Sequence, residues 1–171
     1  MTKHGFGLPH LACIKEASRH KERFVDIRAW KMLATCKWIA RRRNSLVFGT
    51  SGIGKTYVAF ALINKAIDDG FSAFYADEPG LLLQMGSKKL AGISKVSLLV
   101  IDEFDPARLS AAEQDNLVSM LGARNGNSST MLITRLPIHC WNLQPGQEHS
   151  LDSFLSSAIL LELRSLPCPR R

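Results

Sequence analysis

Residues 49–56 read Gly49-Thr50-Ser51-Gly52-Ile53-Gly54-Lys55-Thr56, which is the G-x-x-x-x-G-K-T pattern of a phosphate-binding loop. Glycine at positions 49 and 54 permits backbone angles that a Cβ would block, so the loop can wrap an anion with its N–H groups. We expect Lys55 to reach the β- and γ-phosphates of a nucleotide and the Thr56 hydroxyl to ligate Mg²⁺. The following helix directs the positive end of its dipole at the phosphates. All eight residues are therefore candidate nucleotide ligands.

The residues on either side of this loop supply the structural context that the motif requires. Residues 45–48 (SLVF) form a short apolar run typical of a strand. Residues 57–66 (YVAFALINKA) form a run of small and aliphatic residues typical of a helix. The alternative is a chance match in a turn rich in glycine and serine, but chance does not predict a strand before the loop and a helix after it.

Strand-like and helix-like segments alternate along the rest of the chain. Strands are predicted at residues 45–49, 71–76, 97–103, 130–134 and 158–163. Helices are predicted at residues 24–40, from 55 to a stop at Gly70, and at 79–85, 110–124 and 152–157, with a helical turn at 137–141. Such alternation implies an α/β fold with a parallel sheet and helices on both faces. Ligands of these sheets bind at the carboxyl ends of the strands, where the phosphate loop also lies.

Polar residues end two of the predicted strands. Asp102 follows a run of four apolar residues and has the position of a Walker-B aspartate that holds Mg²⁺, and Glu103 beside it is the candidate general base for the attacking water. Thr134 ends the next strand, where a hydroxyl can hydrogen-bond the γ-phosphate and report which nucleotide is bound. The alternative for Asp102 and Glu103 is that they only end a strand. The alternative for Thr134 is that it is an ordinary threonine at a strand end. Asp105, before Pro106, is expected to be a turn residue.

The composition is that of a globular domain. The chain has 171 residues, of which 46% are hydrophobic, enough for one domain with a core. No run of 18 apolar residues predicts a membrane span, and no secretory signal is recognised at the N-terminus, so the cytoplasm is the expected location. Cysteines at positions 13, 36, 140 and 168 have no metal-binding spacing and are expected to be free thiols.

Positive charge is concentrated in the first part of the chain. The net charge is +7, and residues 1–46 carry eleven Lys and Arg against three acids. The densest point is Arg41-Arg42-Arg43. Such a segment can track a phosphate backbone, or it can be a solvated face that only aids solubility, and charge alone does not separate the two.

Further motifs resemble one family. The segment 129–141 (STMLITRLPIHCW) matches the family's pattern S-T-hydrophobic-I-T-S-Q-L-P-hydrophobic-x-x-W at Thr130, Ile133, Thr134, Leu136, Pro137 and Trp141. The segments 109–124 (LSAAEQDNLVSMLGAR) and 38–46 (WIARRRNSL) also resemble family patterns. Together with GTSGIGKT and LLVIDEFD, these motifs make about residues 25–164 similar to AAA+ ATPases of the IstB type, the helpers of insertion-sequence transposases.

This resemblance implies a three-layer P-loop NTPase of the AAA+/ASCE type, with a mainly parallel five-stranded sheet in the order 5-1-4-3-2. It implies ATP and Mg²⁺ as cofactors, with the roles expected above for the loop, Asp102, Glu103 and Thr134. It further implies ATP-dependent assembly of a homo-oligomer on double-stranded DNA, without sequence preference, and engagement of a transposase. A hydrophobic pocket near residues 25–40 is expected to help seat the adenine.

The chain departs from the family pattern at positions that bear on catalysis. The arginine of the family's D-R pair falls on Ser153, where AAA+ proteins usually supply an arginine finger to a neighbouring subunit's nucleotide. Such a finger is worth orders of magnitude in rate, and serine cannot replace it. Arg135 stands where the family has serine. Arg124 matches a family arginine and is therefore the remaining candidate for a contact made in trans.

Two alternatives stay open beside a transposition ATPase. A DnaC-like helicase loader would share the catalytic residues but have another partner, and Ser153 would also suit a nucleotide-binding remnant with little hydrolysis. Family members carry a longer helical region before the ATPase domain, so the chain is expected to be truncated at the N-terminus and diverged at the C-terminus. The expected organisation is a poorly structured basic segment at 1–23, an AAA+ ATPase domain at 24–165 and a tail at 166–171.

Overall fold

A five-stranded parallel sheet forms the centre of the molecule. The computed structural model describes residues 12–84, 93, 95–141 and 148–165. The sheet has the order β2-β3-β4-β1-β5, and each neighbouring pair is parallel. Its strands are β1 (Ser45–Phe48), β2 (Ala73–Asp77), β3 (Leu98–Asp102), β4 (Ser129–Thr134) and β5 (Ile159–Glu162). From the other edge this order reads 5-1-4-3-2, so the predicted fold class is confirmed.

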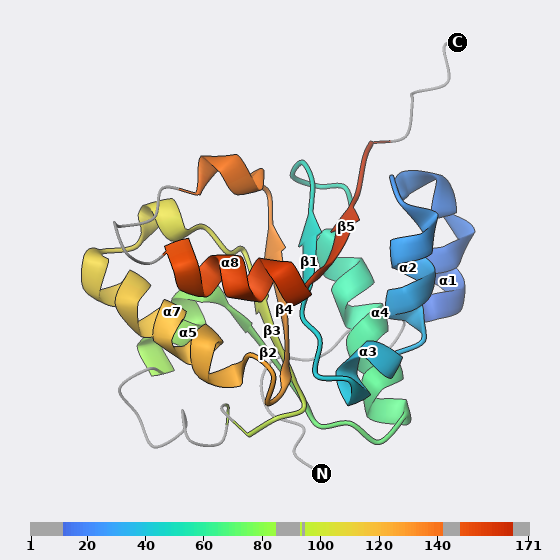
Figure 1. The fold of residues 1–171 in the computed structure, drawn as a ribbon. Coiled ribbons are helices and arrows are strands. Elements are labelled where there is room, and N and C mark those ends of the chain that lie inside the picture. Colours follow the sequence, from blue (N-terminus) through green and yellow to red (C-terminus); the bar gives the residue numbers. More distant parts are fainter. Residues whose placement is uncertain (1–11, 85–92, 94, 142–147, 166–171) are drawn as a thin grey trace.

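Helices cover both faces of the sheet and make it the middle of three layers (Figure 1). One face carries α1 (Ile14–Arg19), α2 (Ile27–Ala34), α3 (Lys37–Ala40) and α4 (Lys55–Asp68). The other face carries α5 (Glu78–Gln84), α7 (Ala111–Arg124) and α8 (Glu148–Ser157). Three short 3₁₀ turns lie between the described helices and strands, at η1 (Lys21–Arg23), η2 (Pro106–Arg108) and η3 (Ile138–Cys140).

The central strands are buried on both faces, as their unbroken apolar runs require. In β3, Leu98 and Val100 belong to the hydrophobic cluster under α2 and α4, whereas Leu99 and Ile101 belong to the cluster under α7 and α8. Successive side chains of a strand point to opposite faces, so one short run of sequence supplies both clusters. The two cores therefore meet across the sheet and fix its position between the helix layers.

The local signals at helix ends are also confirmed. Ser110 and Glu113 form a capping box at the start of α7, in which the Ser110 hydroxyl accepts from the Glu113 backbone N–H and the Glu113 carboxylate accepts from the Ser110 N–H. Gly70 follows the end of α4 with φ 88°, a left-handed angle that favours glycine.

The single amphipathic helix predicted at 24–40 is wrong. The segment forms α2 and α3, separated at Cys36, whose φ of 52° lies in the left-handed region. The apolar period does not reveal the break, because Leu33 and Trp38 are buried on either side of it. The Leu33 carbonyl at the end of α2 accepts from the Cys36 backbone N–H at 3.0 Å and from the Trp38 indole N–H at 3.1 Å, which ties the two helices together.

The expectation of a poorly structured segment at 1–23 is corrected for its second half. Residues 14–19 form α1, which packs on α4, and η1 follows it. The buried side of α1 is small, consisting of Ala17 with the half-buried Ile14, so its apolar signal in the sequence is weak. Residues 1–11 and 166–171 lie outside the described residues, and the division into three parts stays a prediction.

The parallel register brings the polar strand ends to one edge of the sheet. Phe48 lies beside Thr134, and Asp77 lies beside Asp102. The last strand reaches the same edge, where Leu163 forms an antiparallel bridge with Phe24. In the part of the chain that the structure describes, no helix combines the length and apolarity needed to cross a bilayer. Cys13, Cys36 and Cys140 are free thiols.

Candidate functional site

The phosphate loop connects β1 to α4 at this edge of the sheet. Gly49 has φ 142° and Gly54 has φ 91°, so both glycines adopt the positive angles expected of them. Gly54 directly precedes α4, so the first N–H groups of the helix face the loop. This is the geometry of an anion site, with backbone donors and the helix dipole directed at one point.

Gly49 also has no room for a side chain, and this gives a stability prediction. A Cβ at Gly49 would overlap the carbonyl oxygen of Leu163 and meet Cδ1 of Ile53 at 2.6 Å. Gly49→Ala should therefore lower the free energy of unfolding by about 3 kcal/mol, because overpacking against backbone adds to the cost of a positive φ. Urea unfolding followed by circular dichroism measures the change.

Gly52→Ala is the matched control in the same loop. Its φ is 77°, and a Cβ there would have no heavy atom within 4 Å. The cost should then be about 1 kcal/mol, which is the conformational term alone. Equal losses for the two variants would contradict the proposed contact between Gly49 and the end of β5.

Lys55 begins α4 and reaches back over the loop. Its ammonium donates to the carbonyl oxygens of Gly49 and Thr50, each at 2.8 Å. Burial lowers the pKa of Lys55 below its ordinary value, and the positive charge of Arg135 lowers it further, while Asp102 opposes both effects. An anion bound beside Lys55 would relieve the cost that burial and Arg135 impose on its charged form.

Asp102 is the centre of a hydrogen-bonded group at the end of β3. Its side chain is buried, and Oδ2 accepts hydrogen bonds from the Thr56 hydroxyl at 2.8 Å and from the Tyr75 hydroxyl at 3.0 Å. Its Oδ1 accepts from the Glu103 backbone N–H at 2.7 Å. The structure thus brings together Thr56 and Asp102, the two residues that the sequence predicts as Mg²⁺ ligands.

The chemistry of this pair fits Mg²⁺. The cation prefers oxygen ligands and is usually held by one or two protein oxygens together with phosphates and water. Thr56 offers a hydroxyl and Asp102 a carboxylate within hydrogen-bond distance of each other. Among the residues that the structure describes, no group of three His, Cys, Asp or Glu side chains could hold a metal by itself. A cation here would therefore depend on the nucleotide for its remaining ligands.

Sequence reasoning missed Tyr75. The residue lies in β2 beside Val100 of β3, and its ring packs against Phe60 of α4 with 4.7 Å between ring centroids. Burial and the neighbouring Asp102 raise the pKa of the Tyr75 hydroxyl, so it stays a hydrogen-bond donor to the carboxylate. The sequence does show a tyrosine in the predicted strand at 71–76. Only the strand order, however, shows that Tyr75 and Asp102 meet.

Glu103 and Thr134 face the same pocket from neighbouring strands. Glu103 is exposed and has φ 57°, so the chain turns sharply after Asp102 and points the two carboxylates differently. Thr134 is buried, and its hydroxyl accepts from the Leu136 backbone N–H at 3.0 Å. Both line a pocket of about 400 Å³. The other residues around this pocket are Ser51, Gly52, Gly54, Lys55, Thr56, Asp102, Arg108, Ile133 and Arg135.

The structure does not bring Arg124 to this pocket. The side chain is 2% exposed, and its guanidinium donates at 2.7–3.1 Å to the Thr130 hydroxyl and to three backbone carbonyls. Thr130 is the second residue of β4 whereas Thr134 is its last, so the two sites lie about 13 Å apart along the strand. Burial lowers the pKa of Arg124 to about 10. The expected contact in trans is therefore corrected: Arg124 is a structural residue.

A second pocket, of about 300 Å³, lies on the other side of the phosphate loop. A base attached to phosphates at the loop could reach this pocket, because Gly54 lines both pockets. None of residues 25–40 lines this pocket, whose walls come from α1, η1, Phe24, the phosphate loop, α4 and Leu163, so an adenine seat near residues 25–40 stays a prediction. Its lining residues are Glu16, Ala17, His20, Arg23, Phe24, Ile53, Gly54, Tyr57, Val58 and Leu163.

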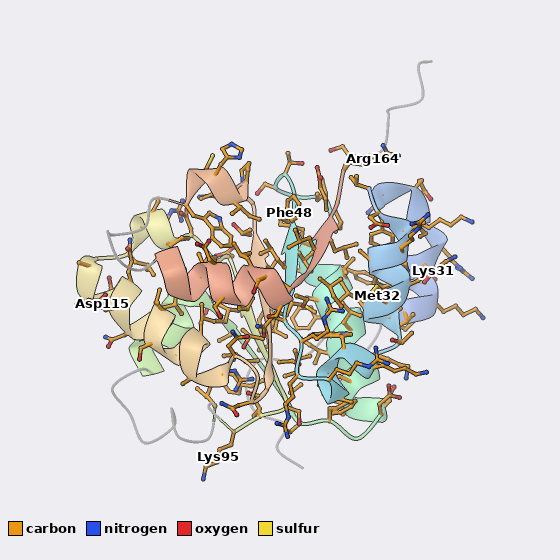
Figure 2. All side chains as sticks on the ribbon, in the orientation of Figure 1. Lys31, Met32, Phe48, Lys95, Asp115 and Arg164 are labelled. Atoms are coloured by element: carbon orange, nitrogen blue, oxygen red, sulfur yellow. The ribbon has the colours of Figure 1, made fainter. Side chains whose placement is uncertain are left out.

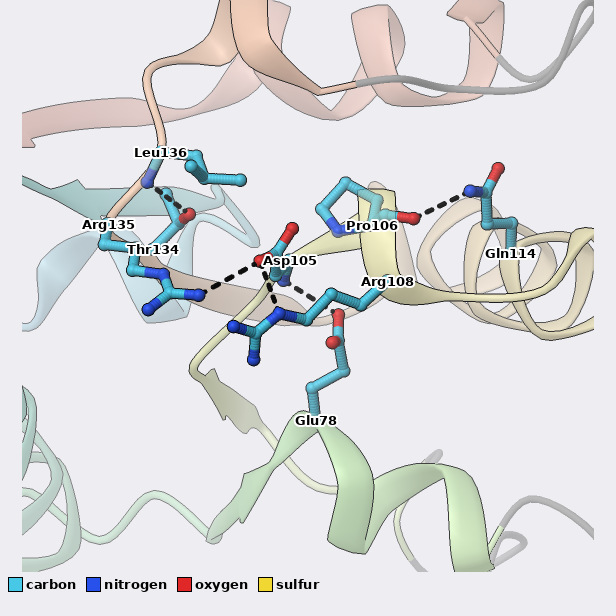
Figure 3. Close-up of polar contacts among 8 residues, drawn as sticks. All are labelled: Glu78, Asp105, Pro106, Arg108, Gln114, Thr134, Arg135 and Leu136. Atoms are coloured by element: carbon cyan, nitrogen blue, oxygen red, sulfur yellow. Dashed lines mark hydrogen bonds and ion pairs between the residues drawn. The ribbon is translucent and has the colours of Figure 1, made fainter.

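Asp105 opens the turn η2, as the sequence predicts, and it is also a buried ion-pair partner. Its side chain is 9% exposed and contacts Arg108 and Arg135. Its backbone N–H donates to a Glu78 carboxylate oxygen at 3.0 Å (Figure 3). Burial raises the pKa of Glu78 to about 7, although the hydrogen bond from the Asp105 backbone N–H acts in the opposite direction. The signal in the sequence, D-P after a Walker-B strand, does not reveal the partners, which come from other elements.

Comparison with known proteins gives one family. The family described as IstB-like ATP binding protein matches residues 4–164. A protein of Pseudomonas fluorescens named as the ATP-binding protein of insertion sequence IS1162 is 35% identical over 134 residues, 74% of this chain. An insertion sequence ATP-binding protein of Sinorhizobium fredii, y4pL, is 28% identical over 160 residues, 89% of this chain. The chain spans 58% of the length of the first relative and 65% of the second.

Solved structures share the fold at lower identity. The DnaC helicase loader has a TM-score of 0.64 and 19% identity, with 80% of this chain and 89% of that chain covered. The replication initiator DnaA bound to AMPPCP and single-stranded DNA has a TM-score of 0.68 and 17% identity, with 94% of this chain and 52% of that chain covered. Both comparisons support the AAA+ P-loop fold.

Proposed function

Because the chain belongs to the family of IstB-like ATP-binding proteins, we propose that it binds ATP with Mg²⁺, hydrolyses it, and assembles with it on double-stranded DNA to assist a transposase. One observation carries the proposal. One pocket is lined by the residues that nucleotide hydrolysis requires, and these residues come from three separate segments of the chain. They are Lys55, Thr56, Asp102, Glu103 and Thr134.

Each of these residues has a role that follows from its position. Lys55 neutralises phosphate charge, and Glu103 orients and deprotonates the attacking water because its carboxylate is exposed to the pocket. Thr134 can donate its hydroxyl hydrogen to a phosphate oxygen while its own oxygen accepts from Leu136. Thr56 and Asp102 would hold Mg²⁺, which neutralises the charge that develops on the phosphates.

Exposed basic residues support the DNA part of the proposal. Arg28 and Lys31 lie on the outer side of α2, where the Lys31 side chain extends away from the protein (Figure 2). Arg41 and Arg42 are exposed after α3, whereas the Arg43 guanidinium donates to the carbonyl of Ser157 and is half-buried. None of these four exposed cations lines the nucleotide pocket.

A DNA-binding measurement with matched nucleotides tests this function. Fluorescence anisotropy of a labelled duplex should show tighter binding with the non-hydrolysable β,γ-methylene analogue of ATP than with ADP. If four cations contact phosphates, a rise from about 50 to about 200 mM salt should weaken binding roughly 100-fold. Lys55→Ala should lower analogue affinity by about 10- to 100-fold and remove the nucleotide effect on DNA binding.

Two outcomes would count against parts of the proposal. DNA affinity that does not respond to salt removes the phosphate contacts, and a nucleotide effect that survives in Lys55→Ala removes the role of the pocket. The transposase is supported by relatives named for insertion sequences, and the helicase loader only by a shared fold. Co-purification with one of these two partners distinguishes them.

A second candidate function is nucleotide binding without useful turnover. Ser153 occupies the position where an arginine finger is expected, and it lies exposed on α8. Its hydroxyl accepts from the Asn125 side-chain amide at 2.8 Å, a contact that serves the protein's own surface. Tight binding of ATP with no phosphate release, with or without DNA, would favour this candidate.

A further inference from the structure

Two arginines to which the family patterns assign no role line the phosphate pocket. Arg135 follows Thr134 at the end of β4, and Arg108 ends the turn η2. Both line the pocket that Lys55 and Glu103 also line, and neither lines the pocket on the base side of the loop. The two arginines therefore lie on the phosphate side of the loop and not on the base side.

One buried carboxylate holds both arginines. Asp105 Oδ2 lies 3.1 Å from Nε of Arg108 and 3.5 Å from Nη2 of Arg135, as Figure 3 shows. The Asp105 side chain is 9% exposed, and its backbone is held by Glu78, whereas the arginine side chains are 68% and 48% exposed. Asp105 is thus the fixed partner, and the two guanidinium groups are the ones that can move.

The charges in this group do not balance. Within this group, the single carboxylate of Asp105 faces two guanidinium groups. The 3.5 Å contact to Arg135 is at the long limit of a hydrogen bond, and Asp105 Oδ1 has no hydrogen-bond partner among the described residues. Arginine has five N–H donors in a planar fork that matches phosphate oxygens. Arg135 can therefore exchange a weak contact with Asp105 for stronger ones to a phosphate.

We propose that Arg135 contacts the terminal phosphate of ATP from within the same chain, that Arg108 adds charge beside it, and that Asp105 retains Arg135 when the nucleotide is a diphosphate. The inference rests on the proposed function, since it names a further ligand of the same nucleotide. It gives the pocket a means to discriminate ATP from ADP that does not need an arginine from a neighbouring subunit.

Isothermal titration with two nucleotides tests the contact. The probes are the Mg²⁺ complexes of ADP and of the β,γ-methylene analogue of ATP. Arg135→Ser should lower affinity for the triphosphate analogue by about ten-fold and leave ADP affinity within about two-fold, because only the triphosphate supplies the partner. Arg135→Lys should recover part of the loss. Lys95→Ser removes an exposed cation before β3 that lines neither pocket, and it should change neither affinity.

The outcomes separate this inference from the function on which it depends. If the folded wild-type protein binds neither nucleotide, the proposed function fails. If wild type binds both, and Lys55→Ala weakens both, the pocket is a nucleotide site. Within that result, an Arg135→Ser variant that matches wild type, or that loses the two nucleotides equally, overturns the contact with the terminal phosphate. Retained ADP affinity also shows that the variant is folded.

Discussion

Arg124→Ala is expected to lower the free energy of unfolding by about 4 kcal/mol. The guanidinium is buried at the end of α7 and donates to the carbonyls of Ile93, Val96 and Ser129. Alanine would remove these buried hydrogen bonds and open a cavity where a large side chain had been. Since domains are stable by roughly 5–15 kcal/mol, the loss is a large share of the total. Urea unfolding with an unchanged m-value measures it.

Arg108→Ala provides the contrast for this measurement. Its side chain is 68% exposed and pairs with Asp105, so its removal should change stability by less than about 1 kcal/mol. An Arg124→Ala variant that unfolds at the wild-type midpoint would contradict the structural role. If such a variant also lost ATPase activity, the contact in trans implied by the family resemblance would be restored.

Glu103→Gln should reduce the rate of phosphate release about 1,000-fold while affinity for ATP stays within about two-fold. Glutamine keeps the size of the side chain, but its amide cannot accept the proton of the attacking water. We expect Glu103 to contribute to turnover, whereas Lys55 and the loop hold the phosphates. Steady-state phosphate release gives the rate, and titration with the β,γ-methylene analogue gives the affinity.

Glu113→Gln is the control for a lost carboxylate. Glu113 belongs to the capping box of α7 and does not line the pocket, and glutamine still accepts the capping hydrogen bond. Turnover should therefore be unchanged. A parallel loss of affinity and rate in Glu103→Gln would show that the carboxylate binds nucleotide and does not act as the base.

Most of the fold follows from local patterns in the sequence. Apolar runs such as 98–101 predict the strands, and signals such as Ser110 with Glu113 and Gly70 predict the helix ends. The strand order came from the family resemblance, because alternation alone does not say which strands are neighbours. Once the order is known, the meeting of Thr56, Asp102 and Thr134 at one edge follows from the parallel register.

What the sequence did not predict depends on contacts between distant segments. Arg124 matches a motif position, but its burial depends on carbonyls before β3 and at the start of β4. Asp105 precedes a proline, yet its partners Arg135 and Glu78 come from other elements. Cys36 breaks a helix whose apolar period continues across it. In each case the conformation depends on a tertiary contact, so no local sequence pattern predicts it.

The contact between Gly49 and Leu163 has a consequence for synthesis of the protein. A ribosome that has completed α4 has already made every residue of the phosphate loop, but the strand that packs against the loop is not yet translated. Leu163 joins Phe24 at the base-side pocket, so early and late segments of the chain must both be present there. A growing chain would then bind ATP only after β5 has emerged from the ribosome. ATP binding would therefore indicate that translation of the phosphate loop's packing partners is finished.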